Sequence, residues 1–315
     1  MFGKFSSITL IIMHSRFRGC LLGLACGDAV GVSVEFKPRG TFPPVTGMTG
    51  GGPFGLKPGQ WTDDTSMALC LAISLLKCKG FDARDQMERY CRWADEGYLS
   101  STGECFDIGN TTKAALDRFK KTGEPFSGPA HARSAGNGSI MRLAPVPMFY
   151  HRSLDATLTY SAESSRTTHG APACLDACRL LGAMIHKALH GRPKDEILFG
   201  PHFPDRVRFK LAKKVQDIAD GRYRDKRASR ISGTGYVVDS LEAALWCFHR
   251  TDSFEAAVLA AANLGDDADT TAAVCGQLAG AFYGEDGIPK AWKRQLAQYE
   301  MIIELADKLN SHDDH

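Results

Sequence analysis

Apolar residues recur along most of this chain with the spacing expected of helices. Alternating strand patterns are nearly absent, and residues 231–238 form the only stretch that the pattern predicts to be extended. Helices are predicted at about residues 16–35 (ending in a turn), 64–79, 82–97, 112–121, 154–165, 171–190, 205–220, 239–249, 252–263, 269–284 and 289–309, with another around Pro145 and Pro147. The pattern therefore predicts an all-α fold, a compact single domain built as an orthogonal helical bundle.

The chain is predicted to consist of a short N-terminal leader and one domain. Residues 1–15 are expected to be a flexible N-terminal leader, followed by one domain at 16–310. The apolar core of the leader, residues 8–13, is too short to span a bilayer and lacks a cleavage site of small residues. No other segment has an uninterrupted apolar run long enough for a span, so we expect a soluble protein without a membrane partner.

Composition and charge exclude further classes of protein. The 43% hydrophobic content is ample for a core, and the net charge of +2 is dispersed, without a basic stripe carrying aromatic residues. Nucleic-acid binding is therefore disfavoured. Ten cysteines lie mostly in apolar, helix-like runs and form no Cys-x-x-Cys pair, which argues against a thiolate zinc site. We expect a reduced, cytoplasmic protein.

The densest candidate chemistry is an aspartate cluster near the C-terminal end. Asp266, Asp267 and Asp269 directly precede Thr270 and a run of small and apolar residues that is typical of a helix. One such residue is enough to cap a helix, so the other carboxylates are surplus to capping. A cluster this dense repels itself unless a cation neutralises it, and oxygen ligands suit Mg²⁺, Mn²⁺ or Ca²⁺.

A second acidic helix start lies at Thr62, Asp63 and Asp64, ahead of the apolar run 67–76. Two such starts in one all-α chain favour a shared metal site over two independent helix caps. Two carboxylates and one hydroxyl from each start are enough to hold two divalent ions and leave positions for water and substrate. The hypothesis is that the two starts meet around metal.

Other acidic motifs fit these residues less well. An EF-hand is excluded because the glycine and the glutamate that its loop requires do not follow the aspartates. Residues 267–269 resemble a phosphatase motif that follows a buried strand, whereas residues 256–262 have helical composition. Prenyl-diphosphate enzymes need a third carboxylate after two spacers, which residues 63–67 lack. Both classes stay open as alternatives.

Glycine-rich loops carry candidates for binding an anion. The stretch that precedes the helix around Pro145 has glycines that expose backbone N–H groups, which suits a phosphate or diphosphate. An ordinary turn is the alternative. The candidate residues of this loop are Ser134, Ala135, Gly136, Asn137 and Gly138.

Further polar candidates stand at junctions between helices. Gly235 lies in another stretch that exposes its backbone, and the ring of Tyr236 would suit a ribose or adenine. His169, just ahead of a helix, is placed to contact a phosphate or ribose. Asp107 and Glu35 each follow apolar residues. A packed tyrosine, a capping histidine and capping or ion-paired carboxylates are the simpler alternatives.

Taken in order, these motifs resemble the ADP-ribosylglycohydrolase family, which includes the ADP-ribosylarginine hydrolases. Any one motif is weak, but the ordered set spans about residues 16–285 and is highly specific. The resemblance rests on Gly23-Leu24-Ala25-Cys26-Gly27-Asp28-Ala29-Val30-Gly31 with Glu35, Trp61-Thr62-Asp63-Asp64-Thr65, Asp107-Ile108-Gly109-Asn110-Thr111, Gly136-Asn137-Gly138-Ser139-Ile140-Met141-Arg142, Thr168-His169, Gly235-Tyr236-Val237-Val238 and Gly265-Asp266-Asp267-Ala268-Asp269-Thr270.

The resemblance implies an all-α fold with a binuclear Mg²⁺ or Mn²⁺ centre in a cleft. By motif position, Asp266 falls outside the ligand set. The implied ligands of the two ions are Thr62, Asp63, Asp64, Asp267, Asp269 and Thr270. No ligand is missing, which argues against an inactive relative. The loop at 134–138 would hold the diphosphate, and His169, Gly235 and Tyr236 would line the ADP-ribose cleft.

The implied reaction is hydrolysis of the N-glycosidic bond between ADP-ribose and a protein side chain, with arginine as the expected carrier. Asp107 is the first candidate for the carboxylate that orients water or protonates the leaving group, and Glu35 is the second. Serine, O-acetyl-ADP-ribose or a nucleic-acid end are alternative carriers. A different class is an immunity protein that neutralises an ADP-ribosyltransferase by occlusion, with the leader as its contact.

Overall fold

A computed structural model describes residues 7–204 and 210–312 and confirms the all-α prediction. Within these ranges the chain forms α-helices, short 3-10 turns and two isolated bridges, but no β-strand. The α-helices are α1 (Ser7–Gly31), α2 (Asp63–Cys78), α3 (Ala83–Glu96), α4 (Asn110–Thr122), α5 (Pro145–Phe149), α6 (Leu154–Arg166), α7 (Pro172–Leu189), α8 (Lys194–Phe199), α9 (Lys213–Ala219), α10 (Val237–His249), α11 (Phe254–Ala262), α12 (Ala268–Tyr283), α13 (Lys290–Gln295) and α14 (Tyr299–Ser311).

Helices α1 and α12 form the centre of the bundle and pack antiparallel with almost no space between their backbones. Glycines recur every four residues on the face of α1 that contacts α12, at Gly19, Gly23, Gly27 and Gly31. A Cβ atom on Gly23 would lie 2.2 Å from the carbonyl oxygen of Gly276, and one on Gly31 would lie 2.4 Å from that of Ala268. No side chain fits there, so the end of α1 is held directly beside the start of α12.

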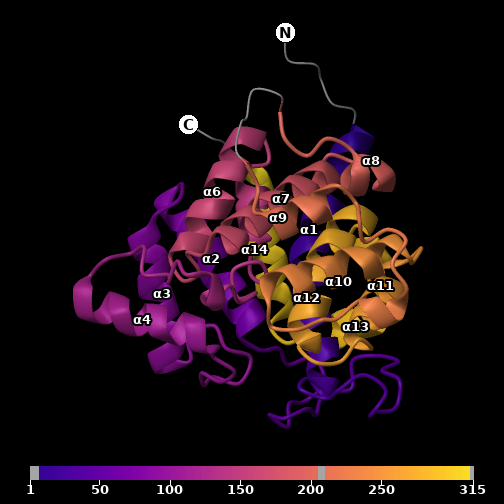
Figure 1. Cartoon of the computed structure of the whole chain (residues 1–315), viewed down its shortest axis with the longest axis horizontal. Coiled ribbons are helices and arrows are strands. Elements are labelled where there is room, and N and C mark those ends of the chain that lie inside the picture. The colour runs from indigo at the N-terminus through magenta and orange to yellow at the C-terminus, as the bar shows by residue number, and fades with distance from the viewer. Residues whose placement is uncertain (1–6, 205–209, 313–315) are drawn as a thin grey trace.

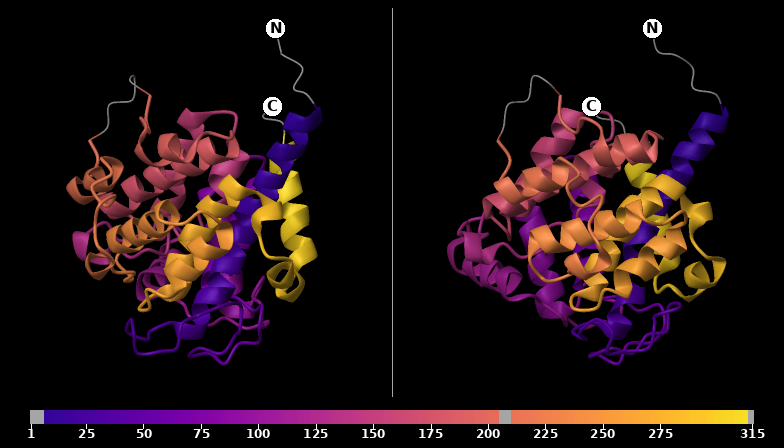
Figure 2. Two further views of the ribbon diagram at one scale, coloured as in Figure 1. Left: turned by 90° about the vertical axis from the view of Figure 1, so that its right-hand side faces the viewer. Right: turned by 45° about the vertical axis from the view of Figure 1, so that its right-hand side comes forward.

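Figures 1 and 2 show α1 running through the middle of the molecule, with α12 on one side and α14 on the other. The stretch Ile12–Val34, which is α1 from Ile12 onward and the 3-10 turn after it, is long and apolar enough to cross a membrane, but 89% of its most apolar window is buried inside the protein. The apolar composition of α1 is therefore explained by its central position. Helices α3 and α4 lie at one flank of the molecule, away from α10, α11 and α13 (Figure 1).

The irregular loop at 37–60 begins beside the segment that leads into α12 and is hydrogen-bonded to it. The N–H group of Phe36 donates to the carbonyl oxygen of Asp266 at 2.7 Å, and that of Asp266 donates to Lys37 at 2.9 Å. Phe36 and Asp266 both have positive φ, 61° and 55°. This reciprocal pair fixes Glu35, the residue before Phe36, next to the start of α12.

Three predicted boundaries differ from the structure. The helix predicted at 289–309 is divided into α13 and α14, because Gln298 has a φ of 52° and interrupts the helical path. Of the helix predicted at 205–220, residues 205–209 lie outside the described residues, and the described residues form α9 from Lys213 to Ala219. Helix α1 begins at Ser7, so the described part of the predicted leader belongs to this helix.

Candidate active site

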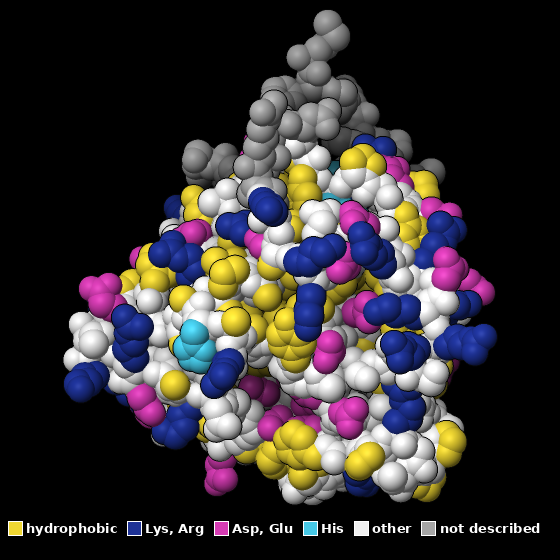
Figure 3. All heavy atoms as spheres, in the orientation of Figure 1, with side chains coloured by type: hydrophobic (Ala, Val, Ile, Leu, Met, Phe, Trp, Pro, Cys, Tyr) yellow, Lys and Arg dark blue, Asp and Glu magenta, His cyan; other side chains and the backbone are white. Residues whose placement is uncertain are grey.

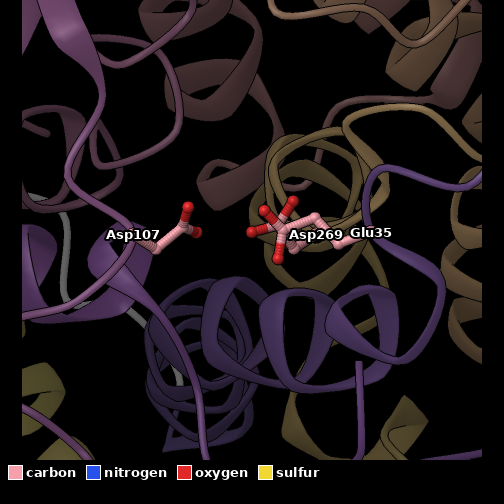
Figure 4. A group of neighbouring side chains, drawn as sticks. All are labelled: Glu35, Asp107 and Asp269. Carbon is pink, nitrogen blue, oxygen red and sulfur yellow. The ribbon is translucent and has the colours of Figure 1, made fainter. Parts of the chain in front are cut away.

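Carboxylates from four segments converge where α1 ends and α12 begins. Asp63 and Asp64 occupy the first turn of α2, and Asp269 occupies the first turn of α12. Glu35 comes shortly after α1, and Asp107 precedes α4. One oxygen each of Glu35, Asp107 and Asp269 lies within 4.8 Å of the others. Figure 4 shows Asp107 pointing toward the other two from the opposite side.

Threonine hydroxyls join the two acidic helix starts. The Oγ1 of Thr62 lies 3.3 Å from Oδ2 of Asp64 and 3.3 Å from Oδ2 of Asp269. The hydroxyl of Thr270 donates to Asp64 at 3.2 Å. The two starts, far apart in sequence, are therefore in direct contact, as the hypothesis required.

Asp28 holds the start of α2 from outside that helix. Its carboxylate accepts hydrogen bonds from the backbone N–H of Thr62 at 2.9 Å and of Thr65 at 3.0 Å. It also accepts from the hydroxyls of both threonines, at 3.0 and 2.6 Å. Helix α2 receives no side-chain cap from its own N-cap residue Thr62, so Asp28 of α1 supplies the cap. This leaves Asp63 and Asp64 unused by capping.

The cluster fits a divalent cation. Asp64 Oδ1, Asp269 Oδ1 and Glu35 Oε2 are buried and accept no hydrogen bond from any described residue. Burial and the charge of neighbouring carboxylates raise the pKa of Asp63, Asp64 and Asp269 well above the usual value. Buried oxygens that lack donors and repel one another form the hard donor set that Mg²⁺, Mn²⁺ or Ca²⁺ prefers.

Asp107 and Glu35 complete the same cluster. Burial first, and then the charge of neighbouring acids, raises the pKa of Asp107 to about 7 and the pKa of Glu35 to about 10. Asp107 has a φ of 58°, in the left-handed region that Asp adopts more readily than most residues. Its side chain is half-buried, whereas that of Glu35 is buried. Asp107 is thus the more accessible member of the pair.

A pocket with a volume of about 340 Å³ lies over the cluster, which is within the usual size of small-ligand sites. Figure 3 looks onto this face, with acidic side chains deep in a hollow below its centre. The described residues that line the pocket are Glu35, Phe36, Asp63, Asp107, Gly109, Asn110, Thr111, Thr112, Gly136, Asn137, Gly138, Met141, His169, Gly235, Asp267 and Thr270.

The two predicted glycine loops run side by side along this pocket. Gly136 and Tyr236 form an antiparallel bridge, and the N–H of Asn137 donates to the carbonyl oxygen of Gly235 at 3.0 Å. The amide nitrogen of Asn137 donates to Oδ2 of Asp267 at 2.8 Å. The loops therefore also position one of the predicted metal ligands.

The predicted anion loop divides into an inner and an outer part. The hydroxyl of Ser134 donates to backbone carbonyls of its own loop, and Ala135 is buried; neither lines the pocket. Gly136, Asn137 and Gly138 do line it. The N–H of Gly136 donates to the carbonyl oxygen of Ser134 at 2.8 Å. Among the described residues the N–H of Gly138 has no acceptor. Of the pocket-lining residues in this loop, Gly138 is therefore the one whose backbone N–H is left available to a ligand.

The remaining predicted residues are also near the pocket. His169 is buried beside Gly136 and Gly138 and lines the wall. Gly235 lines it as well, whereas Tyr236 is half-buried against the core, with Lys214 5.0 Å from the centre of its ring. Asp266 has its backbone bonded to Phe36 and Lys37 and does not line the pocket.

Sequence reasoning missed three parts of the site. It did not single out Asp28, although a carboxylate inside an apolar, glycine-rich helix was an available signal. The sequence analysis named Asp107 as a site residue but not the first turn of α4, whose Asn110, Thr111 and Thr112 line the pocket. It also passed over Phe36, whose side chain is 63% exposed at the pocket although it is large and apolar.

Comparison with known proteins identifies the family to which the chain is similar. The profile of the ADP-ribosylglycohydrolase family matches residues 10–315. An ADP-ribosylarginine hydrolase Tri1 of Serratia proteamaculans is 45% identical, covering 93% of this chain and 78% of the relative. The ADP-ribosyl-[dinitrogen reductase] glycohydrolase of Rhodospirillum rubrum is 33% identical, covering 93% of this chain and 92% of the relative. A solved structure titled ADP-ribosylglycohydrolase-related protein complex aligns with a TM-score of 0.84 and 43% identity, over 95% of this chain and 98% of its own.

The fold and site define an all-α hydrolase with an acidic cluster suited to metal at the floor of a small-ligand pocket. The match over nearly the whole chain establishes that this protein belongs to the ADP-ribosylglycohydrolase family. It is therefore a glycohydrolase by family, and the ordered motifs that suggested the resemblance are the segments that build its site.

Proposed function

We propose that this chain hydrolyses the N-glycosidic bond between ADP-ribose and an arginine side chain, and so reverses mono-ADP-ribosylation of proteins. The observation that carries the proposal is the cluster of Glu35, Asp107 and Asp269 at the floor of a pocket with a glycine-loop wall. The 45% identity to a relative named for ADP-ribosylarginine supports arginine as the carrier.

Two Mg²⁺ or Mn²⁺ ions are proposed as cofactors, held at the contact between the two acidic helix starts. When bound, such ions supply positive charge that orients ribose hydroxyls and lowers the pKa of water. The residues proposed to hold them are Thr62, Asp63, Asp64, Asp267, Asp269 and Thr270, with Glu35 next to them.

Asp107 is proposed to orient the attacking water and to protonate the leaving guanidine. It is half-buried, lines the pocket and points at the cluster, so it can contact both solvent and the reacting atoms. Glu35 is the second candidate for this proton transfer, since its carboxylate lies in the same cluster but is buried.

The walls of the pocket support the proposed orientation of the substrate. Gly138 and the first turn of α4 offer backbone N–H groups suited to the diphosphate. Phe36 stands at the cluster end of the pocket, beside Glu35, and offers an aromatic face to a guanidinium. An aromatic side chain there favours arginine over a neutral leaving group.

The test is release of ADP-ribose from an ADP-ribosylated arginine peptide, measured with Mg²⁺, with Mn²⁺ and after EDTA treatment. We expect Asp107→Asn to lower kcat by two orders of magnitude or more, the usual scale for a lost general acid or base. Asp266→Asn is the matched control, because this neighbouring carboxylate lies outside the cluster. Full activity of Asp107→Asn, or of the EDTA-treated protein, would contradict the proposal.

Parallel substrates separate the alternative functions. Serine-linked ADP-ribose, O-acetyl-ADP-ribose and an ADP-ribosylated nucleic-acid end should react more slowly than the arginine peptide. Inhibition of an ADP-ribosyltransferase by the inactive Asp107→Asn protein would instead favour occlusion. The cytoplasmic location inferred from the cysteines stays a prediction.

A further inference from the structure

His169 is held by hydrogen bonds on its backbone and on one ring nitrogen. Its N–H donates to the carbonyl oxygen of Ser165 at 2.6 Å, and its carbonyl oxygen accepts from the Ser165 hydroxyl at 2.8 Å. Its Nδ1 lies 2.9 Å from the hydroxyl of Thr168. The other ring edge lies against the glycine loop, since a Cβ on Gly138 would be 2.7 Å from Cε1 and 3.1 Å from Nε2. The ring therefore has one orientation.

Behind Thr168 lies a fully buried cation. The guanidinium of Arg142 donates to the hydroxyl oxygen of Thr168 at 2.6 Å and lies 4.6 Å from the ring centre of Tyr90. Among the described residues no carboxylate forms an ion pair with Arg142. The shortest hydrogen bond of the buried guanidinium is thus the one to the hydroxyl oxygen of Thr168, which also lies 2.9 Å from Nδ1 of His169.

We infer that Arg142 and Thr168 are positioning residues that fix His169 as the tautomer with its proton on Nε2. A guanidinium has only donors, so the oxygen of Thr168 must accept from Arg142. The proton of the Thr168 hydroxyl then donates to Nδ1 of His169. Nδ1 is thereby an acceptor, and in the neutral ring the proton belongs to Nε2.

The opposite tautomer leaves a buried donor unsatisfied. If Nδ1 carried the proton and donated to Thr168, the hydroxyl proton of Thr168 would have no acceptor among the described residues. An unsatisfied buried donor costs about 1–3 kcal/mol, enough to make that tautomer a minor species. Burial and then the charge of Arg142 also lower the pKa of His169 to about 3, so the ring is neutral at physiological pH.

The consequence is a fixed neutral donor in the pocket wall. Nε2 has no hydrogen-bond partner among the described residues and lies beside Gly136 and Gly138, which line the pocket. Its proton suits an oxygen of the diphosphate or the ribose, and it stays in place across the pH range in which a free histidine would titrate. This role rests on the proposed function, whereas the tautomer itself does not.

The tautomer can be measured directly. Long-range ¹H–¹⁵N correlation spectra of the ¹⁵N-histidine-labelled full chain distinguish the two ring nitrogens, and His169→Gln assigns the signal. We expect the wild-type ring to show an unprotonated Nδ1 and a protonated Nε2, unchanged between pH 6 and 8. A protonated Nδ1, or a ring that titrates in this range, would overturn the inference.

Substitution of Thr168 tests the positioning role. Thr168→Val keeps the shape of the side chain but removes the hydroxyl, and Thr168→Ser keeps the hydroxyl and serves as the matched control. With Mg²⁺ present, we expect the valine variant to bind ADP-ribose about tenfold to a hundredfold more weakly, the scale of one hydrogen bond to a charged group. We expect the serine variant to stay within about threefold and to keep the Nε2–H spectrum.

The two measurements separate the possible failures. Equal ADP-ribose affinity of the valine variant and the wild type would refute the positioning role. If the valine variant unfolds, the comparison passes to Thr168→Ser against Arg142→Lys, in which a cation is kept but its geometry is lost. Absence of ADP-ribose binding by the wild type would reject the proposed function, and the spectrum would still decide the tautomer.

Discussion

The acidic cluster predicts that removing one of its charges makes the metal-free protein more stable. The perturbation is Asp269→Asn, which keeps the volume of the side chain. Asp269 is buried, its Oδ1 accepts no hydrogen bond from any described residue, and its carboxylate lies within 4.8 Å of Glu35 and Asp107. The amide can also donate a hydrogen bond to one of these neighbours.

The expected size follows from Coulomb's law. Two full charges 4.8 Å apart repel by roughly 3.5 kcal/mol at an effective dielectric constant of about 20. Protonation already removes part of this repulsion in the metal-free protein, because the pKa of Glu35 is raised to about 10 and burial raises the pKa of Asp269 well above its usual value. We therefore expect a net gain of about 1–3 kcal/mol in the free energy of unfolding, or an increase of about 2–6 °C in Tm.

The pH dependence has a definite sign. In the folded chain the pKa values of Asp107 and Glu35 are raised to about 7 and about 10, above the values of about 4 that they have when unfolded. Between these limits the folded state binds more protons, so the free energy of unfolding of the metal-free protein falls as pH rises from about 4 toward 10. Asp269→Asn should make this decline shallower.

The assay is thermal and urea unfolding at pH 6 and pH 8, with EDTA or with added Mg²⁺ or Mn²⁺. Metal at about a hundred times its Kd should stabilise the wild type by about 2.7 kcal/mol and the variant by much less. Asp266→Asn is the control, because Asn tolerates its positive φ and its side chain lies outside the cluster. A metal-free Asp269→Asn protein that is less stable than the wild type, yet still stabilised by metal, would refute the reasoning.

Three further predictions concern residues around the cluster. Gly276→Ala should lower the free energy of unfolding in urea by about 3 kcal/mol or more, because the added Cβ would lie 2.1 Å from the carbonyl oxygen of Gly23. Gly47→Ala is the control, since its Cβ would contact only Trp292, at 3.8 Å, and it should change the free energy of unfolding little. Asp28→Asn should weaken metal binding in calorimetry and lower stability by about 2–3 kcal/mol, because an amide cannot accept all four bonds from Thr62 and Thr65. Phe36→Gly should raise Tm slightly, because glycine adopts the backbone φ of 61° without strain and the lost side chain is exposed. The same variant should have a higher KM for an ADP-ribosylated arginine peptide. An unchanged KM would exclude contact of Phe36 with the leaving group.

Much of the fold was accessible from the sequence because helix periodicity is a local property. The apolar spacing predicted nearly every helix. The sequence pattern did not identify α12 as the partner of α1, although Gly276 and Gly280 stand there at the same spacing of four. It also missed the break at Gln298, because that break depends on the tertiary contact of Ala297 with Gly59 at 2.9 Å.

The part of the site that could be predicted from the sequence is the part marked by more carboxylates than helix capping needs. Two acidic helix starts with more carboxylates than capping needs predicted a meeting point, and the structure brings them into contact through Thr62 and Thr270. Sequence could not show that Asp28 supplies the missing cap across a gap of 34 residues. Nor could it show that most N–H groups of the loop at 134–138 are already bonded. Three of them donate to carbonyl oxygens of residues 131–134 in the same loop, and that of Asn137 donates to Gly235 of the paired loop.

The glycine contact and the acidic cluster depend on each other physically. Carboxylates that repel one another separate if the backbone that carries them can move, and a cation site then loses its affinity. Here Glu35 follows α1 and Asp269 begins α12, so the contact of Gly31 with Ala268 lies within a few residues of both acids. A contact without side chains has no rotamers through which to relax. We therefore expect a substitution along this glycine stripe to reduce metal affinity most at Gly31 and progressively less with distance from it. Gly19→Ala, at the far end of the stripe, should affect stability more than metal binding.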